Sequence, residues 1–124
     1  EAIVERPEQD LVSEATLAQL VRDTSSGIMP KLLTLYIQDA RERVTKIEEA
    51  YRSNDLQTLE FETHTLGSSA GAHSNIALLH ISREIEYLCQ KNDNEKINIL
   101  TPNLISLANK SFELLEKRID QGFS

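Results

Sequence analysis

The sequence has few of the residues that mark several common classes of protein. Its only cysteine is Cys89, so no disulfide can form within the chain, and we expect a reducing, cytoplasmic compartment with Cys89 as a small apolar residue between helices. It has no tryptophan, four glycines and few runs of β-branched residues. This composition disfavours a β-sheet protein and predicts an all-α fold.

Features of nucleic-acid binding, membrane insertion and nucleotide-dependent catalysis are also missing. The formal net charge is −7 and the lysines and arginines form no cluster, so we expect no nucleic-acid partner. No apolar run approaches the roughly 18 residues that a membrane-spanning helix needs, and we see no charged-then-apolar leader, so we expect no direct membrane insertion. Catalytic triads, glycine-rich nucleotide loops and paired cysteines are absent, so we expect no cofactor and no ATP-dependent kinase activity.

Hydrophobic residues make up 40% of the chain and recur at helical spacing. This spacing predicts four long amphipathic helices, at about residues 28–52, 54–72, 75–91 and 101–120, and a short helix before them at about 13–23. The last helix is expected to open at Thr101-Pro102, with Thr101 as its N-cap. Short connections predict an antiparallel up-down four-helix bundle with a short additional N-terminal helix. Residues 1–10 are predicted to be a linker or lead-in, and 11–124 a single domain.

His64 lies on the second of these long helices but outside its predicted buried stripe, which consists of Leu56, Leu59, Thr63, Leu66 and Ala70. The residues one or two helical turns from His64 include Gly67, Ser68 and Gly71, which have small side chains or none. Each glycine inside a helix costs about 1 kcal/mol relative to alanine. We therefore interpret these small residues as a clearing that lets a partner protein approach an exposed imidazole.

The stretch that begins at His64 resembles the signature of the histidine-containing phosphotransfer (HPt) domains of bacterial and fungal phosphorelays. The matching residues are His64, Leu66, Ser69 and Ala70 and, further along, Leu78, Ile85 and Glu86. The sequence departs from the signature at Gly67, where the family usually has lysine, and at Ser68, where it usually has glycine. The resemblance implies that His64 accepts a phosphoryl group from the aspartyl phosphate of a response-regulator receiver domain and passes it to another receiver. It also implies the C-terminal module of a hybrid sensor histidine kinase, which can be tethered to a membrane, with a free-standing HPt protein as the alternative.

Several residues near His64 are candidates for a role in this transfer. Ser68 is placed to donate a hydrogen bond to a phosphoryl oxygen or to hold a ring nitrogen, and the alternative is a small packing residue. Glu60 is expected to be a solvated carboxylate, and the alternative is that it orients the imidazole through its second ring nitrogen. Phe61 is a candidate contact for receiver docking, and the alternative is packing against the N-terminal helix.

The missing lysine at Gly67 leaves open which group offsets the phosphoryl charge. We expect Arg83 to do so, with Lys31 or the partner domain as alternatives, and we also count Arg83 with Phe61 as a docking residue. His73, in a predicted loop, and His80, on an outer helix face, are expected to be solvated. His80 has Glu84 one turn later, but the chain has no second inward-facing pair of this kind, so we expect no metal site.

Two other interpretations of the whole pattern remain. His64 can be an ordinary surface histidine, which is the usual state of an exposed imidazole. The chain can also be a helical adaptor without chemistry, in which the face around Phe61 and Gly67 binds a partner helix.

Overall fold

The helices occupy almost the whole part of the chain that the computed structural model describes, residues 11–123. They are α2 (Glu14–Asp23), α3 (Met29–Arg52), α4 (Leu56–Ala72), α5 (Ile76–Gln90) and α6 (Asn94–Gln121), and no strand occurs between residues 11 and 123. The predicted linker at residues 1–10 lies outside the described residues. None of the described helices has the length and apolar character that crossing a bilayer requires.

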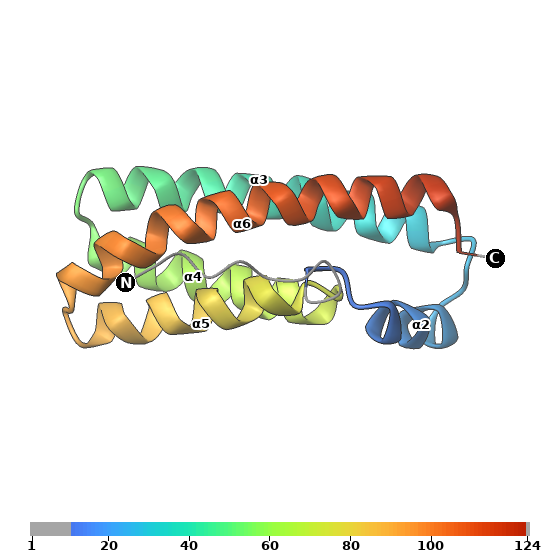
Figure 1. Ribbon diagram of the computed structural model, residues 1–124, viewed down its shortest axis with the longest axis horizontal. Coiled ribbons are helices and arrows are strands. Elements are labelled where there is room, and N and C mark those ends of the chain that lie inside the picture. The colour runs from blue at the N-terminus through green and yellow to red at the C-terminus, as the bar shows by residue number, and fades with distance from the viewer. Residues whose placement is uncertain (1–10, 124) are drawn as a thin grey trace.

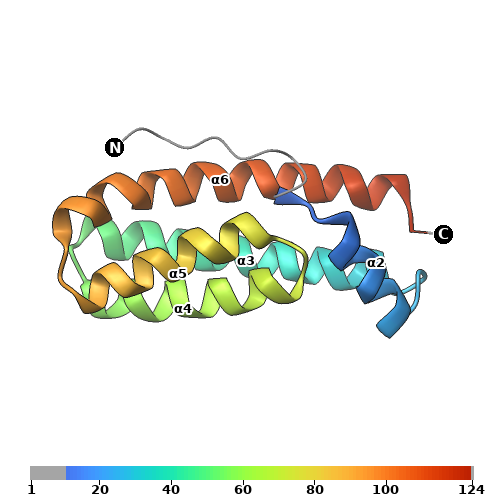
Figure 2. The same cartoon turned by 60° about the horizontal axis from the view of Figure 1, so that its bottom comes forward.

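The four long helices form a bundle in which neighbours in sequence are neighbours in space. α3 packs beside α4, α4 beside α5 and α5 beside α6, and α6 closes the ring against α3 (Figures 1 and 2). The connections span only residues 53–55, 73–75 and 91–93, which leaves room for antiparallel neighbours alone. The short helix α2 lies at one end of the bundle, beside the start of α3 (Figure 1). The predicted all-α four-helix bundle with an additional N-terminal helix is confirmed.

Each of these three connections uses a left-handed residue followed by the N-cap of the next helix. The left-handed residues are Asn54, Ser74 and Asn92, with φ of 57°, 75° and 55°. Asparagine adopts this conformation more readily than other residues with a side chain, because its short amide can hydrogen-bond locally. Asp55 and Asp93 then accept the backbone N–H three residues on, at 3.1 and 3.2 Å, and so begin α4 and α6.

The start of α6 differs from the prediction, and the expected N-cap at Thr101 is wrong. Asp93 caps the helix much earlier, Thr101 is fully buried within it, and Pro102 lies inside the helix. Proline has no N–H to donate to the carbonyl of Asn98, one turn before it. The Tyr51 hydroxyl donates to that carbonyl at 3.4 Å, which compensates for part of the cost of an internal proline.

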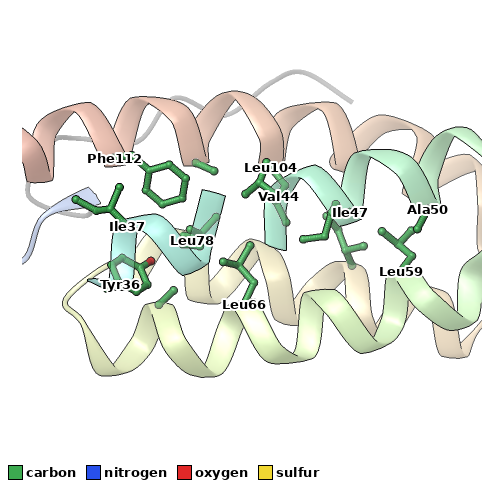
Figure 3. Packing of buried hydrophobic residues seen from close by; sticks show 14 of the residues in the cluster. Tyr36, Ile37, Val44, Ile47, Ala50, Leu59, Leu66, Leu78, Leu104 and Phe112 are labelled. Atoms are coloured by element: carbon green, nitrogen blue, oxygen red, sulfur yellow. The ribbon is translucent and has the colours of Figure 1, made fainter. Parts of the chain in front are cut away.

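The core runs along the bundle axis and takes one stripe from each long helix (Figure 3). It contains the predicted stripe residues Leu59, Leu66 and Ala70 of α4, all fully buried. Burying a leucine side chain completely contributes roughly 1.5–3 kcal/mol, so these residues fix which face of α4 points inward. Cys89 is buried as predicted, and burial, with smaller contributions from nearby carboxylates, raises the pKa of its thiol to about 11.

The connection between α4 and α5 is packed against the bundle rather than solvated, so the expectation of a solvated His73 is wrong. Its ring stacks on Tyr36 with centroids 4.6 Å apart, and its Nδ1 lies 2.7 Å from the carbonyl oxygen of Ser69. The buried Asn75 amide donates to the Tyr36 hydroxyl and to Ser111, both at 3.0 Å. This turn therefore has a fixed geometry, which holds α4 and α5 in register.

Candidate functional site

His64 projects from the middle of α4 because the residue before it points into the core. Thr63 is fully buried, and its hydroxyl donates back to the Leu59 carbonyl at 2.8 Å. On the α3 side, Glu62 is also buried and pairs with Arg43 at 3.2 Å. These contacts fix the rotation of α4 about its own axis, and the next residue, His64, then points outward with its side chain 59% exposed. The predicted exposed histidine on a bundle helix is confirmed.

The imidazole of His64 is held from α5 by Glu86. His64 Nδ1 lies 2.8 Å from Glu86 Oε2, and the Glu86 side chain is only 18% exposed. A carboxylate accepts hydrogen bonds, so this contact assigns the proton to Nδ1 and leaves the lone pair on Nε2. The alternative in which Glu60 orients the ring is not what the structure shows, because Glu86 contacts Nδ1 and Glu60 Oε2 accepts a hydrogen bond from Gln90 at 3.1 Å.

Arg83, one turn before Glu86 on α5, also reaches His64. Its Nη1 donates to the His64 carbonyl oxygen at 3.1 Å and to Glu86 Oε1 at 3.2 Å, and lies 3.3 Å from His64 Nδ1. Its Nη2 donates to the Ser68 hydroxyl at 2.9 Å. The structure therefore brings Arg83 and Ser68 together at the histidine, while Lys31 lies in the first turn of α3 at the α2 end of the bundle (Figure 1).

The interpretation of Gly67 and Gly71 as a clearing for a partner protein is wrong, because α5 of the same chain occupies that space. A Cβ atom built on Gly67 would lie 3.3 Å from both Arg83 Nη1 and Ser82 Cβ. One built on Gly71 would lie 3.2 Å from Leu79 Cδ2. Both distances are tighter than ordinary van der Waals contact. The glycines let α5 approach α4 closely enough for Arg83 and Glu86 to reach His64.

Two large apolar side chains are exposed near the histidine. Phe61, one turn before His64 on α4, is 61% exposed, which rules out its alternative role in packing against the N-terminal helix. Tyr87, adjacent to Glu86 on α5, is 56% exposed and was not predicted. Together with the polar group at His64 they give α4 and α5 the mixture of exposed apolar and charged side chains that is typical of a protein-binding surface.

Glu86 matches the HPt signature but had no predicted role, although it is the direct partner of the imidazole. The signal that could have found it is the helix register. Pairing Gly67 and Gly71 of α4 with an antiparallel α5 across a three-residue turn brings Glu86 opposite His64. His80 is exposed, as expected. Between residues 11 and 123, no three His, Cys, Asp or Glu side chains cluster closely enough to hold a metal ion.

The arrangement is suited to nucleophilic chemistry at Nε2. When an imidazole protonated on Nδ1 attacks an electrophile through Nε2, positive charge develops on the ring. Glu86 faces the nitrogen that carries the proton and stabilises that charge, as the aspartate does in a Ser-His-Asp triad. Arg83 places a cation 3.3 Å from Nδ1 of the same ring, which favours binding of an anionic group at this histidine.

Comparisons with known proteins gave one family and one similar structure. The family model described as "Hpt domain" matches residues 31–121. The search of curated proteins gave no match. Among solved structures, the histidine-containing phosphotransfer protein B (HptB) from Pseudomonas aeruginosa PAO1 is similar, with a TM-score of 0.75 at 20% sequence identity over 90% of this chain and 92% of that chain. This structural similarity extends the shared fold beyond the matched residues.

Proposed function

Because the chain belongs to the Hpt domain family and thus serves histidine phosphotransfer in a phosphorelay, we propose that His64 is the phosphoacceptor and reacts through Nε2. The observation that carries this proposal is the contact between His64 Nδ1 and Glu86 at 2.8 Å. It leaves the nucleophilic lone pair on the outward nitrogen of a side chain that is 59% exposed. His73 is half-buried against Tyr36, and His80 has no comparable contact with α4.

In the proposed transfer, the Nε2 lone pair forms a bond to phosphorus as the bond from phosphorus to the aspartyl oxygen of a receiver domain breaks. The electron pair of the broken bond leaves on the aspartate carboxylate. The proton stays on Nδ1, where Glu86 offsets the positive charge of the ring. In-line geometry requires Nε2 and the leaving oxygen on opposite sides of phosphorus, which an exposed mid-helix side chain permits. The reverse sequence passes the group to another receiver.

We propose that receivers dock on the face formed by Phe61, Tyr87 and the surroundings of His64. Exposed aromatic side chains beside a reactive polar group are typical of the energetic centre of a protein interface. With receiver domains as partners and a single, buried cysteine, we also propose a cytoplasmic location, within a hybrid sensor histidine kinase.

The test is phosphoryl transfer from a phosphorylated receiver domain to the wild type and to His64→Gln. We expect the wild type to gain an acid-labile, base-stable label and the variant to gain none. The melting temperature should change by no more than about 2 °C, because substitution of an exposed residue costs within about 0.5 kcal/mol. His80→Gln serves as the control, because it removes a second exposed imidazole, which lies on α5. This variant should be labelled like the wild type.

Two results would reject this assignment. Equal labelling of wild type and His64→Gln would move the acceptor to another residue. A wild-type domain that binds receivers but never becomes labelled would instead be the adaptor without chemistry.

A further inference from the structure

Arg83 holds an unusual position for an arginine beside a histidine. All four of its contacts, to the His64 carbonyl oxygen, His64 Nδ1, Glu86 and Ser68, lie between 2.9 and 3.3 Å. A guanidinium is a cation, so it gains nothing electrostatically from a neutral ring that already has its Nδ1 proton directed at Glu86. An anion at the histidine would give this cation a second anionic partner beside Glu86.

The place of the guanidinium depends on Gly67. A Cβ atom at that residue would lie 3.3 Å from Arg83 Nη1 and 3.4 Å from Cζ, so the missing side chain provides the space in which the guanidinium rests on α4. Ser68 then holds the other edge of the guanidinium through Nη2 at 2.9 Å. Gly67, Ser68 and Arg83 thus form one unit. In this unit α4 supplies the space and a hydrogen-bond acceptor, and α5 supplies the positive charge.

Phosphorylation would change the charge balance of this unit. In the unphosphorylated domain, Glu86 neutralises Arg83 and also accepts the Nδ1 proton. A phosphoryl group adds about two negative charges. The bond to phosphorus also makes the ring more positive, which strengthens the ionic hydrogen bond between His64 Nδ1 and Glu86. Arg83 then loses part of its partner just as an anion with three acceptor oxygens arrives.

We propose that Arg83, which lies against Gly67, binds the phosphoryl group of phosphorylated His64 by exchanging its hydrogen bond to Glu86 for hydrogen bonds to phosphoryl oxygens. The proposal rests on the function proposed above. The Arg83 side chain is 40% exposed, so it can rotate toward Nε2 without disrupting the core. Its planar fork suits two oxygens at once. Arg83 would then prolong the lifetime of the phosphohistidine by stabilising its anionic group.

The test loads the histidine chemically with potassium phosphoramidate, so that it does not depend on any receiver. The lifetime of the phosphohistidine is followed by ³¹P NMR in a His80→Gln background, which removes the exposed imidazole on α5. We expect Arg83→Ala to shorten the lifetime about fivefold, as for loss of a partly exposed ionic contact. The double variant Gly67→Lys/Arg83→Ala, which places a cation where the guanidinium was, should recover much of it. Arg83→Gln keeps a hydrogen-bonding side chain without the charge, and should behave like Arg83→Ala.

Arg41→Ala is the matched control. Arg41 is 45% exposed and forms an ion pair of 3.1 Å with Glu116, against 40% and 3.2 Å for Arg83 and Glu86. Its removal should leave the lifetime unchanged. In roughly 1 M salt the difference between wild type and Arg83→Ala should narrow, because screening weakens the ionic contact but not a structural role.

Unchanged lifetimes in both Arg83→Ala and Arg83→Gln would overturn this proposal and leave the proposed function intact. If the lifetimes of the Arg83 variants shorten as expected but the wild type accepts no phosphoryl group from any phosphorylated receiver, the proposed function alone is overturned. If Arg83→Ala fails to fold by circular dichroism, Arg83→Gln decides the question.

Discussion

Glu86→Gln is the sharpest test of how the imidazole is activated. Glutamine keeps the length of the side chain and a carbonyl oxygen that can accept the Nδ1 proton, so the ring keeps its orientation. The variant loses the negative charge that faces the developing imidazolium and that also pairs with Arg83. We therefore expect slower phosphoryl acceptance without loss of the fold.

The size of the effect follows from the contact and its exposure. A hydrogen bond to a charged group contributes about 1.5–3 kcal/mol. The pair here is 2.8 Å long, but the His64 side chain is 59% exposed and that of Glu86 18%, so solvent weakens the interaction. We therefore take a value just below this range, about 1.4 kcal/mol, which corresponds to a roughly tenfold slower transfer.

The assay is single-turnover transfer from a phosphorylated receiver in a quench-flow instrument, with the domain in excess. Glu60→Gln is the matched control, since it makes the same chemical change one turn from His64 in a carboxylate that contacts Gln90 instead. We expect Glu60→Gln to transfer at the wild-type rate. Equal rates for Glu86→Gln and the wild type, with both folded, would refute the role of the carboxylate charge. Slow transfer by Glu60→Gln would instead support the alternative in which Glu60 orients the ring.

Two further predictions concern the surface and the core. Phe61→Ala should slow phosphoryl transfer from a receiver severalfold and change the free energy of unfolding by no more than about 0.5 kcal/mol. Leu35→Ala, which removes a comparably exposed apolar side chain of α3, should change neither the rate nor the free energy of unfolding. A larger loss of stability than of rate in Phe61→Ala would assign Phe61 to the core. The free energy of unfolding of the wild type should fall relative to Cys89→Ala as pH rises from about 9 to about 11, because the folded thiol, with a pKa of about 11, keeps its proton after the unfolded thiol, with its ordinary value of 9.0, has ionised. Chemical denaturation at several pH values in this range measures the free energy of unfolding of both proteins. A constant difference between the two free energies across the range would contradict the prediction.

The bundle could be predicted from the sequence because its helices have strong apolar stripes and clear caps. Ser13 accepts the Thr16 N–H at the start of α2, and α3 ends at Arg52, in agreement with the helices predicted at about 13–23 and 28–52. The start of α6 could not be predicted by the same rules. Thr101-Pro102 is a good N-terminal signal locally, but the N-cap Asp93 and the burial of Thr101 outweigh it. Tertiary packing decided this boundary, as the Tyr51 hydroxyl at the Asn98 carbonyl shows.

The candidate site was only half predictable. Helical periodicity alone put His64 on an exposed face, since it depends only on α4. The partners of His64 depend on the packing of α5 against α4, which one sequence does not reveal. Glu60 was therefore considered as one candidate for the role that Glu86 has, and Gly67 was interpreted as space for another protein although Arg83 and Ser82 fill it. Arg83 was placed correctly because it lies off the buried stripe of its own helix.

The three-residue connection between α4 and α5 has a consequence for how the domain folds. His64 and Glu86 are 22 residues apart in sequence, and Ser68 and Arg83 are 15 apart, so the whole constellation belongs to one helical hairpin. Closing such short loops costs little entropy, and local contacts form early in helical proteins. The contact between α3 and α6 closes a far longer loop. We therefore expect a newly synthesised chain to assemble its reactive face before its bundle closes.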